Sequence, residues 1–248
     1  MNFRFSFLVR LIFCLSLFFL LGGCKKENRC DCIKRTGEIV KEKRNISGFT
    51  QLLVKDNVNV FITQDSVFDV TVEAGDNLVP LITTNLDGNT LVCENKNRCN
   101  WTRSYKKPIN VHVRMPTVSI IEASGTGNIV GMNKIKVPNC YILTRNSGNV
   151  ELTIDTPTLT TAMHGSADVV LHGYAHDHAC DIGGSGFLKA ADMFTEYTYL
   201  HTYTLGLCYV YVHDLFICKI DQKGDIYAYG NPKYVGTTYN SSGKLYLQ

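Results

Sequence analysis

The sequence predicts an all-β fold, a parallel β-helix in which each coil of about 20 residues stacks on the coil before it. A short phrase recurs in its second half: a small or polar turn followed by alternating apolar residues, as in Gly127-Asn128-Ile129-Val130 and Gly148-Asn149-Val150. Alternation indicates strands with one buried and one solvated face. No long stretch carries apolar residues at helical spacing, so successive strands are expected to stack in parallel.

The period of the repeat follows from aligning these phrases. The steps are 21, 19, 19, 21, 17 and 19 residues when the equivalent positions are Asn128, Asn149, Asp168, Phe187, Cys208, Asp225 and Lys244. A period near twenty with variable turns is typical of a solenoid, whose units contact only their neighbours. We therefore expect one continuous β domain over residues 45–248.

The part of this domain before the regular ladder is predicted to be irregular but rich in strands. Asp56-Asn57-Val58-Asn59-Val60 repeats the later phrase and is interpreted as the first coil of the same solenoid. Asp76 is expected to cap one helical turn, which Pro80 keeps short. Asp87-Gly88-Asn89 predicts a hairpin turn. Further strands are expected at 49–54, 68–73 and 109–114.

The first 23 residues have the form of a secretory signal peptide. Arg4 and Arg10 are followed by an apolar segment, Leu11 to Leu21, that is short for a membrane span. Leu21-Gly22-Gly23-Cys24 resembles the lipobox of bacterial lipoproteins, in which the cysteine becomes the lipidated first residue. We expect lipid on Cys24 to anchor the exported protein to the bacterial cell envelope, at the outer membrane. The alternatives are an ordinary signal peptide and an uncleaved anchor.

The next segment and the overall charge limit the choice of partners. Residues 24–44 are polar and charged, and are expected to form a tether between the membrane and the domain. The formal net charge of +3 falls to +1 when Arg4 and Arg10 leave with the signal peptide. A nearly neutral chain gives no argument for nucleic-acid binding. The sequence has no phosphate loop, dinucleotide fingerprint or nucleophile elbow, so no cofactor is expected.

Cysteine positions suggest both a disulfide and free thiols, since an exported protein can form disulfides. Cys93 and Cys99 bracket one loop and are a candidate pair, but a pairing with Cys30 or Cys32 is equally open. Three other cysteines are each followed two positions later by an isoleucine, and successive members of this set are separated by two periods of the repeat. They are predicted to be free thiols stacked two coils apart inside the β-helix: Cys140, Cys180 and Cys218.

A basic, aromatic loop at residues 94–107 departs most from a plain scaffold. It contains five cations against one acid, and the only tryptophan of the chain. Aromatic rings can stack on sugars and cations can hold acidic groups, so a ligand is expected to contact Trp101, Arg103, Tyr105, Lys106 and Lys107. The alternative is a hairpin whose Trp101 packs over one end of the β-helix, with solvated charges around it.

Tyrosines in the strands form a second candidate surface. They are expected to lie on the outer face of the ladder: Tyr197, Tyr199, Tyr203, Tyr209, Tyr211, Tyr227, Tyr229 and Tyr246. Tyrosines stacked on a flat sheet can recognise a partner, although tyrosine is also a favourable strand residue.

Two further groups of side chains have the chemistry of ligands or catalysts. His172, His176 and His178 crowd around Asp177, with His164 one turn back, but the cluster is expected in a solvated turn and no metal site is predicted. Six aspartates are expected at turns, where Asp suits the backbone geometry, rather than in a catalytic pair: Asp168, Asp181, Asp192, Asp214, Asp221 and Asp225.

The chain also resembles a known family. The residues that carry the resemblance are Asn45-Ile46-Ser47-Gly48-Phe49, Asp56 to Val60, Glu73 to Leu78 and the coil Ser124 to Ile129. They resemble the putative auto-transporter adhesin, head GIN domain family of bacterial envelope lipoproteins, from about Arg44 to Gln248. The resemblance implies a right-handed, single-stranded parallel β-helix and brings no established catalytic residues. Ser166-Ala167-Asp168 and Leu207-Cys208 depart from the family's phrase because they lack its glycine.

These observations favour a non-catalytic protein that is held at the membrane by its N-terminal lipid. Its expected role is adhesion, with a glycan or another envelope protein as partner. The alternatives are an enzyme that acts on polysaccharides and a purely structural envelope protein.

Overall fold

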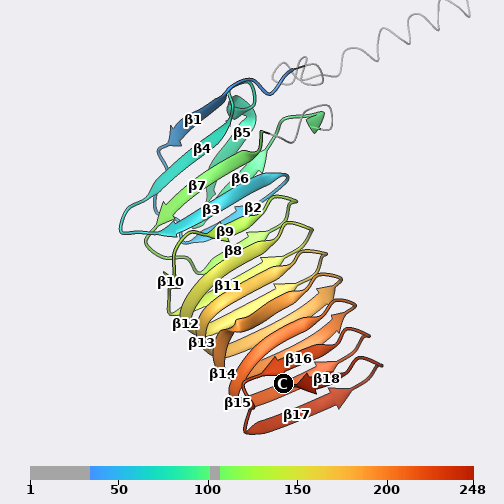
Figure 1. Cartoon of the computed structure of the whole chain (residues 1–248). Coiled ribbons are helices and arrows are strands. Elements are labelled where there is room, and N and C mark those ends of the chain that lie inside the picture. The colour runs from blue at the N-terminus through green and yellow to red at the C-terminus, as the bar shows by residue number, and fades with distance from the viewer. Residues whose placement is uncertain (1–33, 101–106) are drawn as a thin grey trace, which may run out of the picture. The chain divides into compact units, whose positions relative to one another are not determined.

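The computed structural model describes residues 34–100 and 107–248 (Figure 1). The chain divides into two compact units, and the larger one comprises residues 36–96 and 105–248. All strands discussed below belong to the larger unit. No α-helix occurs in the described residues, in agreement with the predicted all-β class.

The strands follow the chain in the order β1 to β18, with one 3-10 turn between β4 and β5. Their bounds are β1 (Ile39–Arg44), β2 (Gln51–Val54), β3 (Val58–Gln64), β4 (Asp69–Gly75), η2 (Val79–Leu81), β5 (Ile82–Asp87), β6 (Thr90–Asn95), β7 (Ile109–Met115), β8 (Ile120–Ala123), β9 (Ile129–Gly131), β10 (Ile135–Lys136), β11 (Asn139–Thr144), β12 (Val150–Met163), β13 (Val169–Gly184), β14 (Leu188–Thr204), β15 (Cys208–Ile220), β16 (Ile226–Tyr229), β17 (Tyr234–Tyr239) and β18 (Leu245–Leu247).

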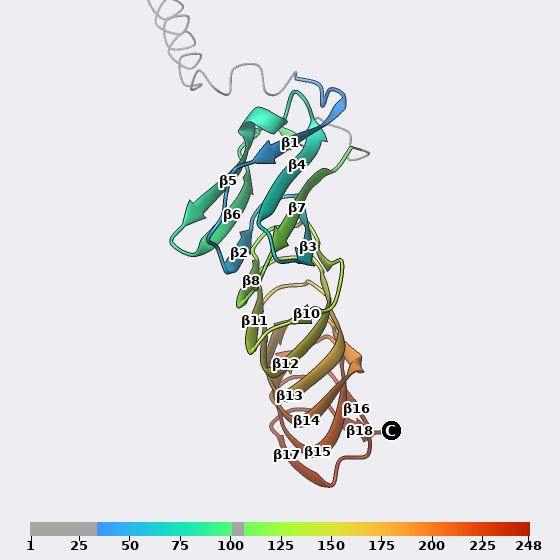
Figure 2. The same cartoon turned by 90° about the vertical axis from the view of Figure 1, so that its left-hand side faces the viewer.

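The regular part is a parallel β-solenoid, as predicted. Val150 pairs with Val169, and Val169 with Leu188, so one coil takes about 19 residues at this point. Figure 2 shows these coils following one another along one axis. Each coil has a first arm and a second arm, which in β12 are residues 150–156 and 158–163. The arms meet at a corner where two consecutive residues, Pro157 and Thr158, face outward.

The turns between coils explain why a polar residue recurs at the start of each phrase. Asn128 Oδ1 accepts a hydrogen bond from the Asn149 backbone N–H at 3.1 Å, and Asn149 Oδ1 accepts one from Asp168 at 2.9 Å. Asp168 Oδ1 in turn accepts from Phe187 at 3.1 Å. The side-chain ladder stops at Phe187, because a phenyl ring has no acceptor oxygen.

The predicted alignment needs one correction. Leu188 pairs with Cys208, and the Leu188 N–H donates to the carbonyl oxygen of Leu207. Leu207, rather than Cys208, is therefore the equivalent of Phe187. The coils around it are uneven because the register between β14 and β15 shifts twice, after Ala190 and after Thr195. Because these bulges shorten one coil, the alignment predicted from the sequence is displaced by one residue at this point.

The first coil joins the solenoid out of sequence order. Val60 of β3 pairs in parallel with Ile129 of β9, so residues 50–64 stack directly on the coil that begins near residue 118. The prediction of a first coil at Asp56 to Val60 is thus confirmed. The intervening strand β7 pairs in parallel with the other edge of β3. Strand β4 then pairs antiparallel with β7, and β1 pairs antiparallel with β4.

Strand β1 starts inside the predicted tether at 24–44 and corrects that boundary. The charges that suggested a solvated tether are matched across the strand pair, since Lys41 Nζ lies 3.0 Å from Glu73 Oε2. Arg44 Nη2 donates to the carbonyl oxygen of Val79 at 3.2 Å. Alternating cations on an exposed edge strand also hinder pairing with another chain.

The local predictions for the N-terminal part are partly right. The β5–β6 hairpin turns at Gly88-Asn89, as expected. The helical turn is a 3-10 turn, and Leu78 rather than Asp76 is its N-cap. Asp76 Oδ1 instead accepts a hydrogen bond from its neighbour Asn77 N–H at 2.8 Å.

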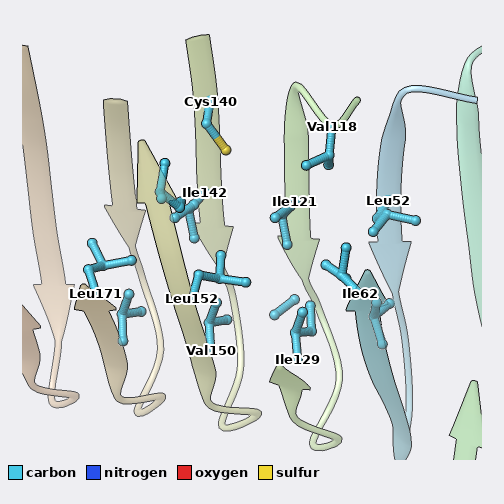
Figure 3. Close-up of a cluster of buried hydrophobic side chains, with 14 of the residues drawn as sticks. Leu52, Ile62, Val118, Ile121, Ile129, Cys140, Ile142, Val150, Leu152 and Leu171 are labelled. Carbon is cyan, nitrogen blue, oxygen red and sulfur yellow. The ribbon is translucent and has the colours of Figure 1, made fainter. Parts of the chain in front are cut away.

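One hydrophobic core fills the space between the arms. Alternate strand residues such as Ile121, Ile142 and Leu152 point into it (Figure 3). Cys180 and Cys218 lie in one interior column with Leu200 between them, two coils apart as predicted. Cys140 is buried too, but it pairs with Leu159 and belongs to the neighbouring column. The expected alignment of all three thiols is therefore wrong, because Cys140 lies two residues along its strand from the column of the other two.

Candidate functional site

The basic loop at residues 94–107 is described only in part. Trp101, Arg103, Tyr105 and Lys106 lie outside the described residues. Lys107 is described, and its side chain is held within the domain: Nζ donates to the carbonyl oxygen of Gly37 at 2.7 Å and lies 3.4 Å from Glu38 Oε1. The ligand contacts expected of this loop therefore stay a prediction.

Of the disulfides that the sequence left open, the one between Cys93 and Cys99 is not formed. Cys93 is a free thiol that points into the core from β6, whereas Cys99 is disulfide-bonded. Burial raises the pKa of Cys93 to about 12, because the interior cannot solvate a thiolate. The alternative partners Cys30 and Cys32 lie outside the described residues.

The histidine cluster does not lie in a turn, because the corner of this coil is part of the continuous strand β13. The outward pair at the corner is His176 and Asp177, and the next residue, His178, turns into the core. His178 Nε2 lies 3.0 Å from Thr161 Oγ1 and 3.2 Å from Cys180 Sγ. Within residues 34–100 and 107–248, no three His, Cys, Asp or Glu side chains are grouped to hold a metal ion.

The six aspartates divide between turns and strands. Asp168, Asp221 and Asp225 lie in turns between coils, as expected. Three others lie within strands: Asp181, Asp192 and Asp214. The strand position of Asp181 matters most, because it places the carboxylate on the outer surface of the second arm.

The predicted tyrosine surface is two surfaces, because the two arms face different ways. The first arm carries Tyr209, Tyr227 and Tyr246 in one register column. Their ring centroids are 5.3 and 5.0 Å apart and successive rings are inclined by 16°. A second column on this arm stacks Tyr174 on Phe194 at 5.9 Å. These rings cover one another's faces, and ring faces are what a sugar would stack on.

Three of the predicted tyrosines lie on the second arm, and their rings differ in how far they are free. Tyr197 meets His176 edge-on at 5.0 Å, and the Tyr203 hydroxyl donates to Asp181 Oδ2 at 3.0 Å. Tyr199 is 47% exposed, and no aromatic ring of the described residues stacks on it. Tyr199 is therefore the one of these three tyrosines whose ring is free to contact a ligand.

Tyr199 stands in a surface groove of about 380 Å³. One side of the groove is apolar and shallow because Thr160 and Ala179 are small, with Ile217 beyond Tyr199. The other side is polar and is formed by Asp181, His201 and Lys219. A volume of this order is that of a small-molecule site, and the mixture of apolar floor and a few polar groups is typical of one.

The polar side of the groove is held by hydrogen bonds to Asp221 and by a close contact between His201 and Asp181. His201 Nδ1 lies 3.2 Å from Asp181 Oδ1, and His201 Nε2 lies 2.8 Å from Asp221 Oδ2. Lys219 Nζ also donates to Asp221, at 2.7 Å. The hydrogen bonds from Lys219, His201 and Asn240 lower the pKa of Asp221, so its carboxylate is charged at neutral pH. These contacts therefore fix the side chains before any ligand arrives.

Sequence reasoning found Tyr199 and singled out Asp181, which it expected in a turn, but it missed His201 and Lys219. Asp181, His201 and Lys219 come from three successive strands, β13 to β15, and they become neighbours only when the exact register of each coil is known. A search for outward residues one coil apart would have grouped them, provided that the bulges in β14 were included.

The fold and the groove define a parallel β-solenoid protein with a preformed surface site. More particularly, the chain belongs to the putative auto-transporter adhesin, head GIN domain family, which its sequence matches over residues 48–232. A search of curated proteins finds no match to the sequence. In the described residues, no helix is long and apolar enough to cross a membrane.

Solved structures confirm the fold. A putative adhesin from Bacteroides fragilis NCTC 9343 is 20% identical, with a TM-score of 0.79 over 85% of this chain and 97% of that one. A putative lipid binding protein from Parabacteroides distasonis ATCC 8503 is 18% identical, with a TM-score of 0.67 over 86% and 97%. A putative adhesin from Parabacteroides merdae ATCC 43184 is 15% identical, with a TM-score of 0.62 over 86% and 98%.

Proposed function

We propose that this protein is a lipid-anchored binding protein of the bacterial cell envelope that recognises its partner without chemical turnover. The Leu21-Gly22-Gly23-Cys24 sequence supports lipid attachment at Cys24. A cysteine that carries a thioether-linked lipid and a further acyl chain has the two anchors that stable membrane attachment needs. The partner is a glycan or another envelope protein.

The observation that carries the binding function is the groove beside Tyr199. It combines a free aromatic ring with polar groups already fixed by hydrogen bonds. Rigid polar groups bind a ligand at a lower entropic cost than mobile ones. The loop at Trp101 to Lys107 is a second proposed contact, on the strength of its composition alone.

An enzyme that acts on polysaccharides is the alternative, since the carboxylates of Asp181 and Asp221 both lie close to His201, at 3.2 and 2.8 Å. A glycosidase needs one carboxyl group whose pKa is raised so that it can act as an acid. The pKa of Asp221 is shifted in the opposite direction by its hydrogen bonds to Lys219, His201 and Asn240. Asp221 is therefore unsuited to the role of the general acid.

The test combines a glycan array with pull-down of partners from intact envelopes, using the lipidated protein. Tyr199→Ala should remove binding, whereas Tyr246→Ala, a tyrosine on the opposite arm, should leave it unchanged. A loop variant, Trp101→Ala with Arg103→Ala and Lys106→Ala, measures the contribution of the loop. Binding that survives both Tyr199→Ala and the loop variant would refute both sites. Release of reducing ends from a bound glycan would establish the enzyme instead.

Lipid attachment is tested separately by intact-mass spectrometry of the mature protein. We expect a mass that includes lipid on Cys24, and Cys24→Ala should leave unprocessed precursor or release the protein from the membrane. An unmodified Cys24 in the mature protein would contradict the anchor.

A further inference from the structure

The groove has a direction, which follows from the register of the strands beneath it. Thr160 pairs with Ala179, Ala179 with Tyr199, and Tyr199 with Ile217. These four outward residues form one column that crosses four strands, from β12 to β15. Neighbouring strands are about 4.8 Å apart, so the column is about 14 Å long. The groove therefore runs along the solenoid axis, perpendicular to the strands, and is longer than a single sugar ring.

A polar column runs beside the apolar one. Asp181 pairs with His201, and His201 with Lys219, so each polar side chain lies two positions along its strand from a member of the apolar column. Along the strand direction the space is limited, since the hydroxyl of Tyr203 bonds Asp181 and the His176 ring packs against Tyr197. A ligand that fills the groove must then follow the columns.

The polar column already pairs its one lysine with an aspartate. Asp221 is bonded to Lys219 and His201, and the second nitrogen of His201 faces Asp181. An anionic ligand would lie against Asp181 and Asp221 and would have to break the pair between Lys219 and Asp221 to find a counter-charge, at a cost in binding free energy. Neutral hydroxyl groups can bind the remaining lone pairs and N–H groups without breaking this pair.

We infer that the groove binds a linear, non-acidic oligosaccharide that lies along the solenoid axis. One sugar ring stacks on Tyr199, and the hydroxyl groups of successive rings follow Asp181, His201 and Lys219. This inference rests on the proposed binding function and adds the orientation, length and charge of the ligand. A flat column of small side chains before a free tyrosine fits an extended chain, whereas a single sugar would need a closed pocket.

The test uses two neutral series, glucose to cellohexaose and N-acetylglucosamine to chitohexaose, with oligogalacturonates as the acidic control. Affinity is measured by titration calorimetry with the soluble domain. We expect affinity for at least one neutral series to rise at least tenfold from the monosaccharide to the tetrasaccharide and then level off. The oligogalacturonates should bind more weakly than neutral chains of the same length.

Two variants test the direction of the groove. Thr160→Arg places a bulky side chain at one end and should lower the affinity for long chains at least tenfold. Thr153→Arg, on the first arm of the same strand, is the matched control and should change nothing. Circular dichroism and the unfolding midpoint of each variant show whether it folds.

The outcomes separate this inference from the proposed function. Monosaccharides that bind as tightly as hexasaccharides, stronger binding of the acidic series, or an unaffected Thr160→Arg variant would each overturn the axial site. No binding by either neutral series would also overturn it. The proposed function would nevertheless survive if envelope pull-down captured a partner that depends on Tyr199.

Discussion

The buried histidine His178 should make the solenoid sensitive to mild acid. Its side chain is 1% exposed, and burial lowers its pKa from 6.5 to about 4, because the core cannot solvate an imidazolium. Between these two values the unfolded chain binds a proton that the folded chain does not. The contribution of neutral His178 to stability is therefore complete above about pH 6.5 and is lost as the pH falls towards 4.

The size of this loss follows from the shift of the pKa. A shift from 6.5 to about 4 corresponds to about 3 kcal/mol in the free energy of unfolding, of which about 2 kcal/mol is lost by pH 5. Urea denaturation at pH 8, 7, 6 and 5 measures it. His178→Leu is the informative variant, since the residue paired with His178 in the preceding coil is Leu159.

We expect the variant to lose about 2 kcal/mol less stability than the wild type between pH 8 and pH 5. At pH 8 the variant should be somewhat less stable, because the Thr161 hydroxyl loses its partner. His176→Leu, in the exposed corner position two residues earlier, should keep the acid sensitivity of the wild type. An equal loss of stability in the wild type and in His178→Leu would refute this account of the core.

Three further predictions test the architecture. Gly206→Ala should cost about 3 kcal/mol or prevent folding, because a Cβ atom there would lie 2.0 Å from the carbonyl oxygen of Gly186; urea unfolding measures this, and a stable variant would contradict the close backbone stacking. Asn149→Ala should cost about 1–2 kcal/mol by leaving the Asp168 N–H without its acceptor, and Glu151→Ala, on the exposed surface, is the control. Finally, iodoacetamide should label Cys93, Cys140, Cys180, Cys208 and Cys218 only after unfolding and without reductant, because all five are buried free thiols. Labelling of the folded protein, or a need for reductant, would count against the interior columns.

The fold could be predicted from the sequence because the residues that repeat are also the residues that join one coil to the next. Asn128, Asn149 and Asp168 each supply the oxygen that bonds the next coil, so the residues that define the period also make the contacts. The faces were harder to predict. At the corner of each coil two consecutive residues point outward, as Glu196 and Tyr197 do before buried Thr198, and the alternation changes phase there.

That change of phase explains the errors at the candidate site. It turns His178 inward, although simple alternation from Ala175 would place it outside. The two arms that meet at this corner also face different ways, which separates Tyr199 from Tyr209, although the sequence placed them on one surface. The groove itself depends on the bulges of β14, which set the spacing of His201 and Lys219 and leave no signal in a single sequence.

The stacking of β3 on β9 has a consequence for the order of folding. Asn59 and Asn128, which are hydrogen-bonded where these two strands meet, stand 69 positions apart in the sequence, whereas Asn128 and Asn149 of the next coil stand only 21 apart. Closing the longer loop costs about 1 kcal/mol more in chain entropy, and contacts distant in sequence form more slowly. When the chain is synthesised or exported from its N-terminus, residues 50–64 therefore stay unpaired with β8 and β9 until those strands are also available. The regular coils should nucleate first, and the earliest segment to emerge should be among the last to join the sheet.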